Sequence, residues 1–333
     1  MNSIVFDQPG DPRQVLELRD LPTPTPSSGH VLVRILASPI NPSDLIFITG
    51  TYGIRPTLPA TPGFEGVGIV ESGGGFLGWL RKGRRVAVLN DRTGNWREFS
   101  TLPARQVIPV PSDISDEQAA CFFVNPATAL VMTQRILRIP KGGWLLQSAA
   151  GSSLGRMIIR LGKRLGFRTM NVVRRPDAVE ELKSLGADEV ICAEGPAITE
   201  QVLLLTKGLG VRYAIDPVGG DTGSAVIASL ASGGHALLYG LLSRQPVTID
   251  PRFLLDGSKR MEGFLLSDWV QQQNVISVLK LFRRVWKLIR EGVLSTDRLL
   301  AFPLVNFRRA VEQAMLPGKP GKVVLRISED RKR

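Results

Sequence analysis

The succession of a strand, a small-residue turn, a helix and a second strand over residues 144–173 constrains the fold of this chain more than any other feature. The stretch reads WLLQSAAGSSLGRMIIRLGKRLGFRTMNVV. Its middle part repeats apolar side chains at helical spacing, namely Leu154, Met157, Ile158, Leu161 and Leu165. Ser152 or Ser153 can cap the start of this helix, and Gly166 can end it. A strand that leads through a helix into another strand predicts a parallel sheet.

The rest of the chain divides into a β-rich part and a part that repeats this alternation. Short alternating apolar segments between Pro and Gly clusters predict strands at residues 30–37, 66–71 and 85–89. From about residue 116 the pattern predicts helices at 116–138 and 270–292, and strands at 144–147, 168–173, 189–192, 212–215 and 235–240. The tail returns to strands, at 299–304 and 322–327, on either side of a short helix at 306–315.

A chain of 333 residues is too long for one ordinary core, which predicts two domains. A β-type tail most economically rejoins the β-rich N-terminal part. We therefore predict an α/β protein with a β-rich domain at residues 1–118 plus 297–333. The domain inserted into it, at residues 119–296, is expected to hold a doubly wound parallel sheet.

Composition excludes several kinds of protein. Two cysteines and two histidines, far apart, argue against a zinc site, a disulfide framework and a Ser-His-Asp triad. The net charge of +12 is scattered in short clusters without a nucleic-acid motif, so it favours a polyanionic cofactor or substrate. The most apolar stretch, residues 223–242, is broken by glycines, which argues against a membrane span. The first residues lack a leader pattern, so we expect a cytoplasmic location.

The turn at residues 148–155 is a candidate phosphate site. Small residues let a backbone approach a pyrophosphate, whose charge meets free N–H groups at a helix start. An ordinary tight turn is the alternative, because serines stand where the usual fingerprint has glycines. The second strand decides between them: it ends in Arg174 and Arg175, with no acid before Asp177. Two guanidiniums suit a 2′-phosphate, which predicts NADPH rather than NADH.

The whole chain resembles the zinc-free branch of the medium-chain dehydrogenase/reductase superfamily. Within that branch it is similar to trans-2-enoyl-thioester reductases of the mitochondrial type and, less closely, to NADPH:quinone reductases. The resemblance rests on SPINPSD, TYG, LPATPGFEGVG, GNWREF, VNPATA, NVVRRPD, KSLGADEVI, YGLLSRQPV and GFLLSDW. It implies a GroES-like β-rich catalytic domain with an inserted Rossmann domain. Where zinc-dependent relatives carry a ligand His before Glu, this sequence has Phe64 before Glu65.

The resemblance also implies a set of cofactor residues. Asn125 would touch the nicotinamide region, and Arg174 and Arg175 would bind the 2′-phosphate, with the choice between them open. The pyrophosphate would meet Gly151, Ser152, Ser153 and Leu154. The remaining residues expected to close around the cofactor are Tyr239, Gly240, Leu241, Leu242, Phe264, Leu265, Leu266, Ser267 and Lys322.

Tyr52 falls on the position of the proton donor in the family. A neutral phenol, with an ordinary pKa of about 10, stays protonated at working pH and can supply a proton. The alternative is a packed rim residue. Asn41 either positions this phenol or the substrate, or forms an Asx-type turn before Pro42. Trp96 either lines the acyl or pantetheine path, as the resemblance implies, or belongs to the core of the β-rich domain.

Three functions follow from this reading. The leading prediction is NADPH-dependent reduction of the C=C bond of 2-enoyl thioesters on CoA or an acyl carrier protein. The alternative within enzymes is reduction of quinones or small enones, and the alternative of another class is a catalytically silent NADPH-binding protein. We expect a homodimer by analogy, and neither a nucleic-acid nor a membrane partner.

Overall fold

The computed structural model describes residues 1–74, 81–90 and 93–328 and divides into two compact units. Unit 1 consists of Met1–Val124 and Thr296–Arg333, and unit 2 of Asn125–Ser295. The chain therefore enters unit 2 after Val124, later than the boundary at residue 118 that the sequence suggested, and leaves it after Ser295. The first crossing lies later because the backbone N–H groups of Phe123 and Val124 are bonded to the Glu65 side chain of unit 1.

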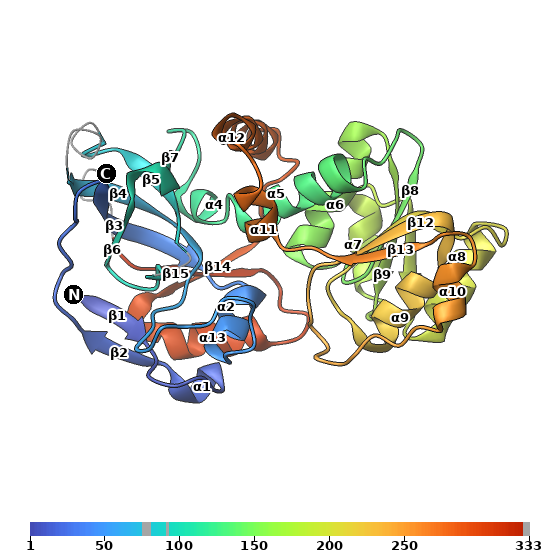
Figure 1. Ribbon diagram of the computed structural model, residues 1–333, viewed down its shortest axis with the longest axis horizontal. Helices are drawn as coiled ribbons and strands as arrows, with labels where there is room; N and C mark the ends of the chain where they lie inside the picture. Colours follow the sequence, from blue (N-terminus) through green and yellow to red (C-terminus); the bar gives the residue numbers. More distant parts are fainter. Residues whose placement is uncertain (75–80, 91–92, 329–333) are drawn as a thin grey trace. The chain divides into compact units, whose positions relative to one another are not determined.

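Unit 1 is built on a mostly antiparallel sheet (Figure 1). Its strand order is β14 (Leu299–Pro303), β15 (Lys322–Arg326), β3 (His30–Pro39), β4 (Glu65–Gly73), β5 (Arg85–Leu89) and β7 (Val107–Pro109), with β6 (Phe99–Pro103) also paired to β3. The strands β1 (Asn2–Val5) and β2 (Glu17–Asp20) form a separate pair. Its helices are α1 (Pro12–Val15), α2 (Pro42–Ile48), α4 (Asp116–Ala120) and α13 (Phe307–Met315). The tail strand β15 pairs with β3, so the C-terminal part does rejoin the N-terminal part.

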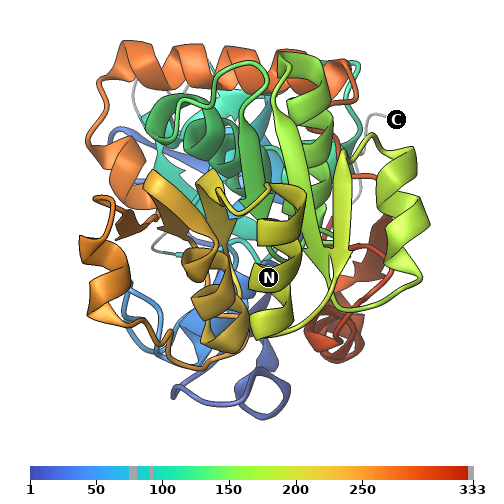
Figure 2. The same ribbon diagram turned by 90° about the vertical axis from the view of Figure 1, so that its right-hand side faces the viewer.

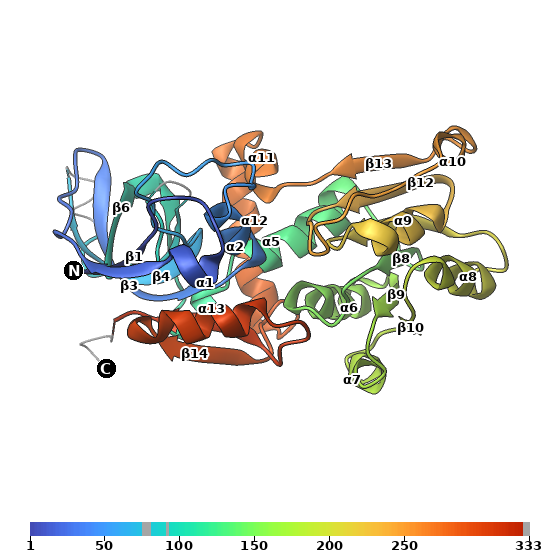
Figure 3. The same cartoon turned by 90° about the horizontal axis from the view of Figure 1, so that it is seen from below.

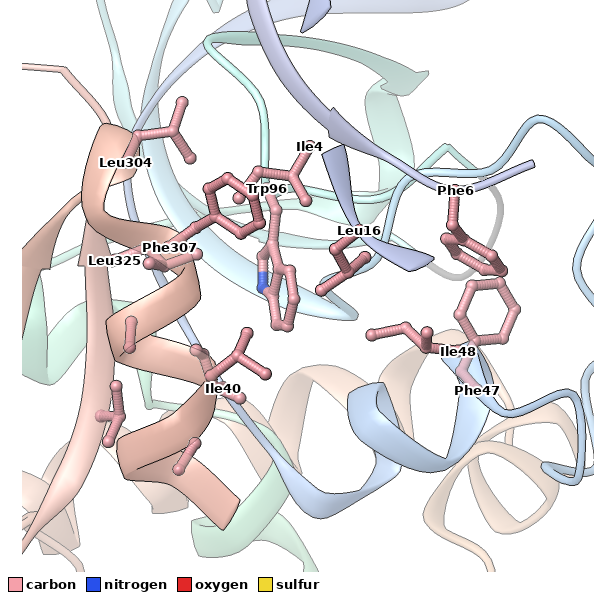
Figure 4. Close-up of a cluster of buried hydrophobic side chains, with 14 of the residues drawn as sticks. Ile4, Phe6, Leu16, Ile40, Phe47, Ile48, Trp96, Leu304, Phe307 and Leu325 are labelled. Carbon is pink, nitrogen blue, oxygen red and sulfur yellow. The ribbon is translucent and has the colours of Figure 1, made fainter. Parts of the chain in front are cut away.

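The core of unit 1 joins residues from both ends of the chain (Figure 4). Side chains of β1, α2 and the first loops meet those of α13 and β15; those labelled in the figure are Ile4, Phe6, Leu16, Ile40, Phe47, Ile48, Trp96, Leu304, Phe307 and Leu325. Phe6 and Phe47 contact edge to face, with ring centroids 5.8 Å apart. Burial of these side chains explains why the tail belongs to unit 1, since its apolar face has no other core to join.

Unit 2 contains a parallel sheet, which Figure 2 shows with its strands side by side. The order is β10 (Glu189–Cys192), β9 (Arg168–Val173), β8 (Trp144–Gln147), β11 (Val211–Asp216), β12 (Leu230–Leu238) and β13 (Arg260–Gly263). The helices are α5 (Val124–Val131), α6 (Ser153–Leu165), α7 (Ala178–Ser184), α8 (Pro196–Leu205), α9 (Gly220–Ala228), α10 (Pro251–Leu255), α11 (Leu266–Gln271) and α12 (Val275–Arg290). The doubly wound parallel sheet that the alternation predicted is thus confirmed.

Helix α6 follows the sequence prediction closely. The Ser152 hydroxyl caps it by accepting a hydrogen bond from the N–H of Gly155, at 3.1 Å. Gly166 ends it in the left-handed conformation, with φ of 87°. Gly155 is needed for close packing, because a Cβ there would lie 2.5 Å from the carbonyl oxygen of Ala150. A short turn can therefore hold the helix directly against the sheet.

Three elements differ from the prediction. The expected helix over 116–138 is interrupted between α4 and α5 and ends in a π-helical turn at Met132–Ile136. The expected helix over 270–292 begins only at Val275, and Asn274 caps its start because its side chain accepts from the N–H of Ser277. Strand β13 was not predicted, because all four of its residues are exposed and carry no alternating apolar pattern.

Candidate functional site

The sheet of unit 2 reverses its strand order between β8 and β11. From β8 the chain continues to β9 and β10 on one side, and from β11 it continues to β12 and β13 on the other. Ile215 of β11 lies opposite Gln147 of β8 at the ends of the two strands. In an open parallel sheet, the loops that follow two such strands diverge and leave a crevice where ligands bind. The predicted phosphate turn follows β8 at this point.

The turn after β8 offers backbone donors and space. The N–H groups of Ser153 and Leu154 lie in the first turn of α6, where a helix has no internal acceptors for them. A Cβ added at Gly151 would meet no heavy atom within 4 Å, so the space beside this residue is free for a ligand. The first turn of α6 contains no acidic residue. Free donors, open space and the positive end of the helix dipole suit a phosphate group.

The two arginines lie at the same edge of the sheet but differ in their partners. Both side chains are exposed and follow β9, the strand paired with β8. Nε of Arg175 lies 3.4 Å from Oδ1 of Asp177. Arg174 forms no ion pair within the part of the chain that the structure describes. Arg174 is therefore the guanidinium with more hydrogen-bonding capacity left for a ligand.

Three polar residues that sequence reasoning did not connect meet at the ends of β8, β11 and β12. The carboxylate of Asp216, which is buried, accepts short hydrogen bonds from the Ser148 hydroxyl and, at 2.7 Å, from the N–H of Gly219. The Tyr239 hydroxyl is buried without a hydrogen-bond partner among the described residues. Burial and the nearby Asp216 carboxylate raise the pKa of Tyr239, so this phenol stays neutral and can donate.

The other predicted cofactor residues of unit 2 lie on loops after β12 and β13. Gly240 lies so close to Pro217 that a Cβ would stand 2.7 Å from its carbonyl oxygen. Leu241 and Leu242 are exposed, as is Leu265, whereas Phe264 is buried and its N–H donates to Leu238. Leu266 and Ser267 begin α11, and Asn125 is the second residue of α5, partly exposed. Their contacts with a cofactor stay predictions.

The donors and space at this edge fit an adenine dinucleotide phosphate. Phosphate groups match the free N–H groups of α6 and the guanidinium of Arg174. The unpartnered hydroxyl of Tyr239 needs an acceptor, and a buried polar group without one is costly. The site therefore offers the donors and the space that the predicted cofactor, NADPH, requires.

Tyr52 is located in unit 1, on the loop after α2. Its side chain is partly buried and packs against Phe64, with ring centroids 5.4 Å apart. Gly50, with φ of 75°, turns the chain at the end of α2. The phenol is thus held on one side by an aromatic neighbour while part of it remains accessible. This position is compatible with both interpretations of Tyr52, proton donor and rim residue.

Trp96 is a core residue of unit 1, the second of the two interpretations that the sequence left open. The indole has no exposed surface, and its Nε1–H donates to the carbonyl of Pro39 at 3.3 Å. A Cβ at Gly63 would lie 2.5 Å from the indole ring, so the Gly-rich turn is shaped around it. Figure 4 shows the ring among the aliphatic side chains of this core. In the GNWREF motif, the tryptophan therefore fills the core of unit 1.

Asn41 is also buried, at the N-cap position of α2 before Pro42. Its Nδ2 donates to Oε1 of Glu65 at 3.0 Å, and its Oδ1 accepts from Nζ of Lys322. Asp44 closes the turn before α2, because its side chain accepts from the N–H of Asn41 at 2.7 Å. With 1% of its surface exposed, Asn41 has no side-chain surface for a substrate. Sequence reasoning missed Glu65 and Asp44, although both stand in the motifs that carry the resemblance.

Lys322 has a partner inside unit 1. Its ammonium donates to Asn41, and 4% of the residue is exposed. Its predicted contact with the cofactor stays a prediction. Within residues 1–74, 81–90 and 93–328, no group of three or more His, Cys, Asp or Glu side chains is arranged to hold a metal ion. Over the same ranges, no helix has both the length and the apolar character needed to span a membrane.

Comparison with known proteins places these features in a family. Residues 27–112 match the alcohol dehydrogenase GroES-like domain, and residues 153–284 match the zinc-binding dehydrogenase domain. The chain belongs to the medium-chain dehydrogenase/reductase superfamily, with a GroES-like part and a Rossmann-type parallel sheet. It is an oxidoreductase of the NADPH-dependent, enoyl-reductase-like kind.

Particular relatives agree with this assignment. The chain is 35% identical to the mitochondrial enoyl-[acyl-carrier-protein] reductase of Homo sapiens, over 98% of this chain and 88% of that protein. It is similar to the crystal structure of a putative NADPH:quinone reductase from Bacillus thuringiensis, with a TM-score of 0.90, 35% identity and 98% of both chains covered. It is also similar to the Etr1p complex with NADP and crotonyl-CoA, with a TM-score of 0.82, 25% identity and coverage of 98% and 99%.

Proposed function

We propose that this protein reduces the C=C bond of 2-enoyl thioesters, carried on CoA or an acyl carrier protein, with NADPH. The observation that carries the proposal is Tyr52, the one tyrosine of unit 1, which is partly accessible and packs against Phe64. It supplies the proton donor that this reduction needs, on the unit expected to hold the substrate. The similarity to an enoyl-[acyl-carrier-protein] reductase over nearly the whole chain supports the substrate class.

The cofactor would be held by unit 2. The N–H groups at the start of α6 would bind the pyrophosphate, and Arg174 the 2′-phosphate. Tyr239 would donate its otherwise unpartnered hydroxyl hydrogen to an acceptor on the cofactor. NADPH, when bound, supplies a hydride. Asn125 would hold the nicotinamide end, so that these residues fix both ends of the dinucleotide.

Tyr52 would complete the reduction. When hydride adds to the β-carbon of the substrate, negative charge develops on the α-carbon and the thioester oxygen. The phenol O–H then breaks, its proton goes to the α-carbon, and the phenolate takes a proton back from solvent. A phenol is a suitable donor because it stays protonated at neutral pH, with an ordinary pKa of about 10.

One assay set tests the proposal. NADPH oxidation is followed with crotonyl-CoA, a longer enoyl-CoA and a benzoquinone, for the wild type and for Tyr52→Phe. We expect turnover of the thioesters that Tyr52→Phe largely abolishes. Turnover of the quinone alone would replace the proposal with quinone reduction, the alternative favoured by the similarity to the Bacillus thuringiensis protein. Tight NADPH binding without turnover of any acceptor would indicate a silent NADPH-binding protein.

We also propose a homodimer formed through β13. This strand is at the edge of the sheet in unit 2 (Figure 3), and all four of its residues are exposed. Met261 on it is 39% exposed, and Leu255 of the neighbouring α10 is 80% exposed. An edge strand with exposed apolar side chains pairs readily with a second copy. Light scattering after size exclusion should give a dimer, and Met261→Asp should shift it toward monomer; a wild-type monomer would refute this.

The cellular location is a separate matter. The relatives carry the word mitochondrial in their names. The cytoplasmic location suggested by the sequence stays a prediction, and microscopy of the tagged full-length protein in its native cell would test it.

A further inference from the structure

A buried chain of polar groups in unit 1 ends on the backbone where the chain enters unit 2. Lys322 donates to Asn41, and Asn41 donates to Oε1 of Glu65. Oε2 of Glu65 accepts from the N–H of Phe123 at 3.1 Å and from that of Val124 at 2.9 Å. Glu65 is 2% exposed. The carboxylate therefore binds two backbone groups that are far from it in sequence and adjacent to the crossing after Val124.

Glu65 substitutes for a local cap on α5. The helix begins at Val124, and the residue before it, Phe123, has no side-chain acceptor to offer. Free N–H groups at a buried helix start need an acceptor, and a negative charge there interacts favourably with the helix dipole. Here both come from strand β4, in the Gly-rich turn of the LPATPGFEGVG motif. Most caps are supplied by the neighbouring residue, whereas this one comes from a strand that is distant in sequence.

Burying the charged carboxylate of Glu65 costs free energy, and neighbouring groups offset part of this cost. Burial raises the pKa of Glu65, while the charge of Lys322 and the donated hydrogen bonds of Val124, Asn41 and Phe123 oppose that rise. A second buried carboxyl, Asp44, accepts from the N–H groups of Asn41 and Phe64 and adds negative charge nearby. In other proteins, hydrophobic residues of similar volume have often replaced a buried cluster of charges without loss of stability. A role of this cluster besides stability is therefore open to test.

We propose that Glu65 is a positioning residue that fixes the first turn of α5 and, through it, Asn125. Lys322 and Asn41 hold the charge and orientation of Glu65. The proposal rests on the proposed function, in which Asn125 holds the nicotinamide end of NADPH. Asn125 directly follows Val124, so a displacement of the Val124 backbone moves it. A shift of about 1 Å in a residue that orients a reactant can reduce turnover about 100-fold.

Three variants separate positioning from stability. Glu65→Leu removes the acceptor and one of the two buried carboxyl groups whose charge Lys322 offsets. Glu65→Leu with Lys322→Met removes the acceptor and the ammonium together, and Lys322→Met alone is its control, because Lys322 is also a predicted cofactor residue. Glu65→Gln keeps one oxygen that can accept from the two N–H groups. Glu71→Gln is the matched control, because Glu71 is on the same strand but pairs with Arg34 at the surface.

The measurements are the melting temperature, kcat and KM with crotonyl-CoA, and the binding and fluorescence emission of NADPH. The double variant should recover the melting temperature lost in Glu65→Leu. Its kcat should nevertheless stay about 100-fold below wild type, while the Kd for NADPH, set mainly at the phosphates, changes by less than about threefold. The emission of bound NADPH should shift toward that of the free cofactor. Glu65→Gln should retain most of kcat and of the wild-type emission.

Two results would overturn the proposal. One is a double variant that recovers kcat and emission together with its melting temperature, which would make the network purely structural. The other is a Glu65→Leu protein with wild-type emission and kcat. Failure of the proposed function looks different: the wild type would then not turn over crotonyl-CoA, or Asn125→Ala would leave the emission of bound NADPH unchanged.

Discussion

In unit 1 the polar groups around Asn41 bond one another, whereas in unit 2 the groups at the carboxyl edge of the sheet leave donors without a protein partner. Asn41, Glu65 and Lys322 are buried, and each has a named partner. Arg174 is exposed without an ion pair among the described residues, and the Tyr239 hydroxyl is buried without an acceptor. Polar groups that are hydrogen-bonded within the protein stabilise its structure. Polar groups without such a partner gain free energy when a ligand supplies one.

Tyr52 stands between these two cases, because its ring is packed but part of the residue is accessible. Replacing it by Phe keeps the contact with Phe64 and removes only the hydroxyl. We expect kcat for crotonyl-CoA to fall between about 100- and 10,000-fold, the usual contribution of a general acid, with the Kd for NADPH unchanged. Steady-state kinetics and fluorescence titration measure both. Tyr213→Phe, on β11, is the control, and equal losses in the two variants would remove Tyr52 from the mechanism.

The buried carboxyl of Asp44, which belongs to the hydrogen-bonded cluster around Asn41, should make the stability of the protein depend on pH. Burial raises the pKa of Asp44 to about 7. Between its ordinary pKa, near 4, and that value, the folded state binds a proton that the unfolded chain does not. The free energy of unfolding therefore falls as pH rises through this window, by at most about 4 kcal/mol from this group.

Asp44→Asn should reduce that slope, because it removes this carboxyl, while Glu65, whose pKa burial also raises, remains. Urea unfolding at several pH values between 4 and 8 measures the slope directly. Glu71→Gln, at the surface of the same unit, should leave it as in the wild type. A slope that Asp44→Asn does not change would mean that Asp44 stays ionised throughout, as its two backbone donors favour.

Binding of NADPH at the carboxyl edge of the sheet in unit 2 should weaken when one arginine is removed. Arg174→Ala should weaken NADPH binding about 10- to 100-fold, the range for a lost charge-assisted contact, and leave NADH binding unchanged. Arg175→Ala should have a smaller effect, because Arg175 already pairs with Asp177. Fluorescence titrations with both cofactors provide the test. The reverse order of the two variants would assign the 2′-phosphate to Arg175.

The smallest effect should come from Trp96, which belongs to the packed part of unit 1. Trp96→Phe leaves a void and removes the donor to Pro39, at a cost of about 1–3 kcal/mol in the free energy of unfolding. The folded protein should keep its kcat and KM within about twofold, because no indole surface is exposed to a substrate. Chemical denaturation and steady-state kinetics measure the two. A selective rise in KM for enoyl-CoA would return Trp96 to the substrate path.

Local patterns predicted much of unit 2. The strands at residues 144–147, 168–173 and 189–192 have the predicted bounds, and α6 has its predicted cap and its terminal glycine. Strand β9 and helix α6 each bury an apolar set of residues at regular spacing, so the signal is carried by neighbouring residues. Strand β13 and the late start of α12 were missed for the opposite reason. An exposed edge strand and a helix preceded by a second short helix leave little periodic signal.

The candidate site divides in the same way. Arg174 and the turn after β8 could be predicted, because each stands directly after a strand whose end marks the crevice. The meeting of Ser148 with Asp216, and of Asn41 with Glu65 and Lys322, could not, since each pair joins segments that are distant in sequence. Trp96 shows the limit of a motif: the residue type was noted, but its burial is a property of the fold.

The sequence by itself determined the alternation of strands and helices, the place of the turn after β8 and of the two arginines after β9, and the family. The first two depend on residues within one turn or one strand of each other, and the family on short motifs that each lie within one segment. Only the tertiary structure decided which polar groups are hydrogen-bonded within the protein and which can still bond to a ligand. That distinction depends on burial and on partners from remote segments. Lys322 comes from the last strand, Asn41 from the residue before α2 and Glu65 from the start of β4, and the first N–H groups of α5 bond to Glu65.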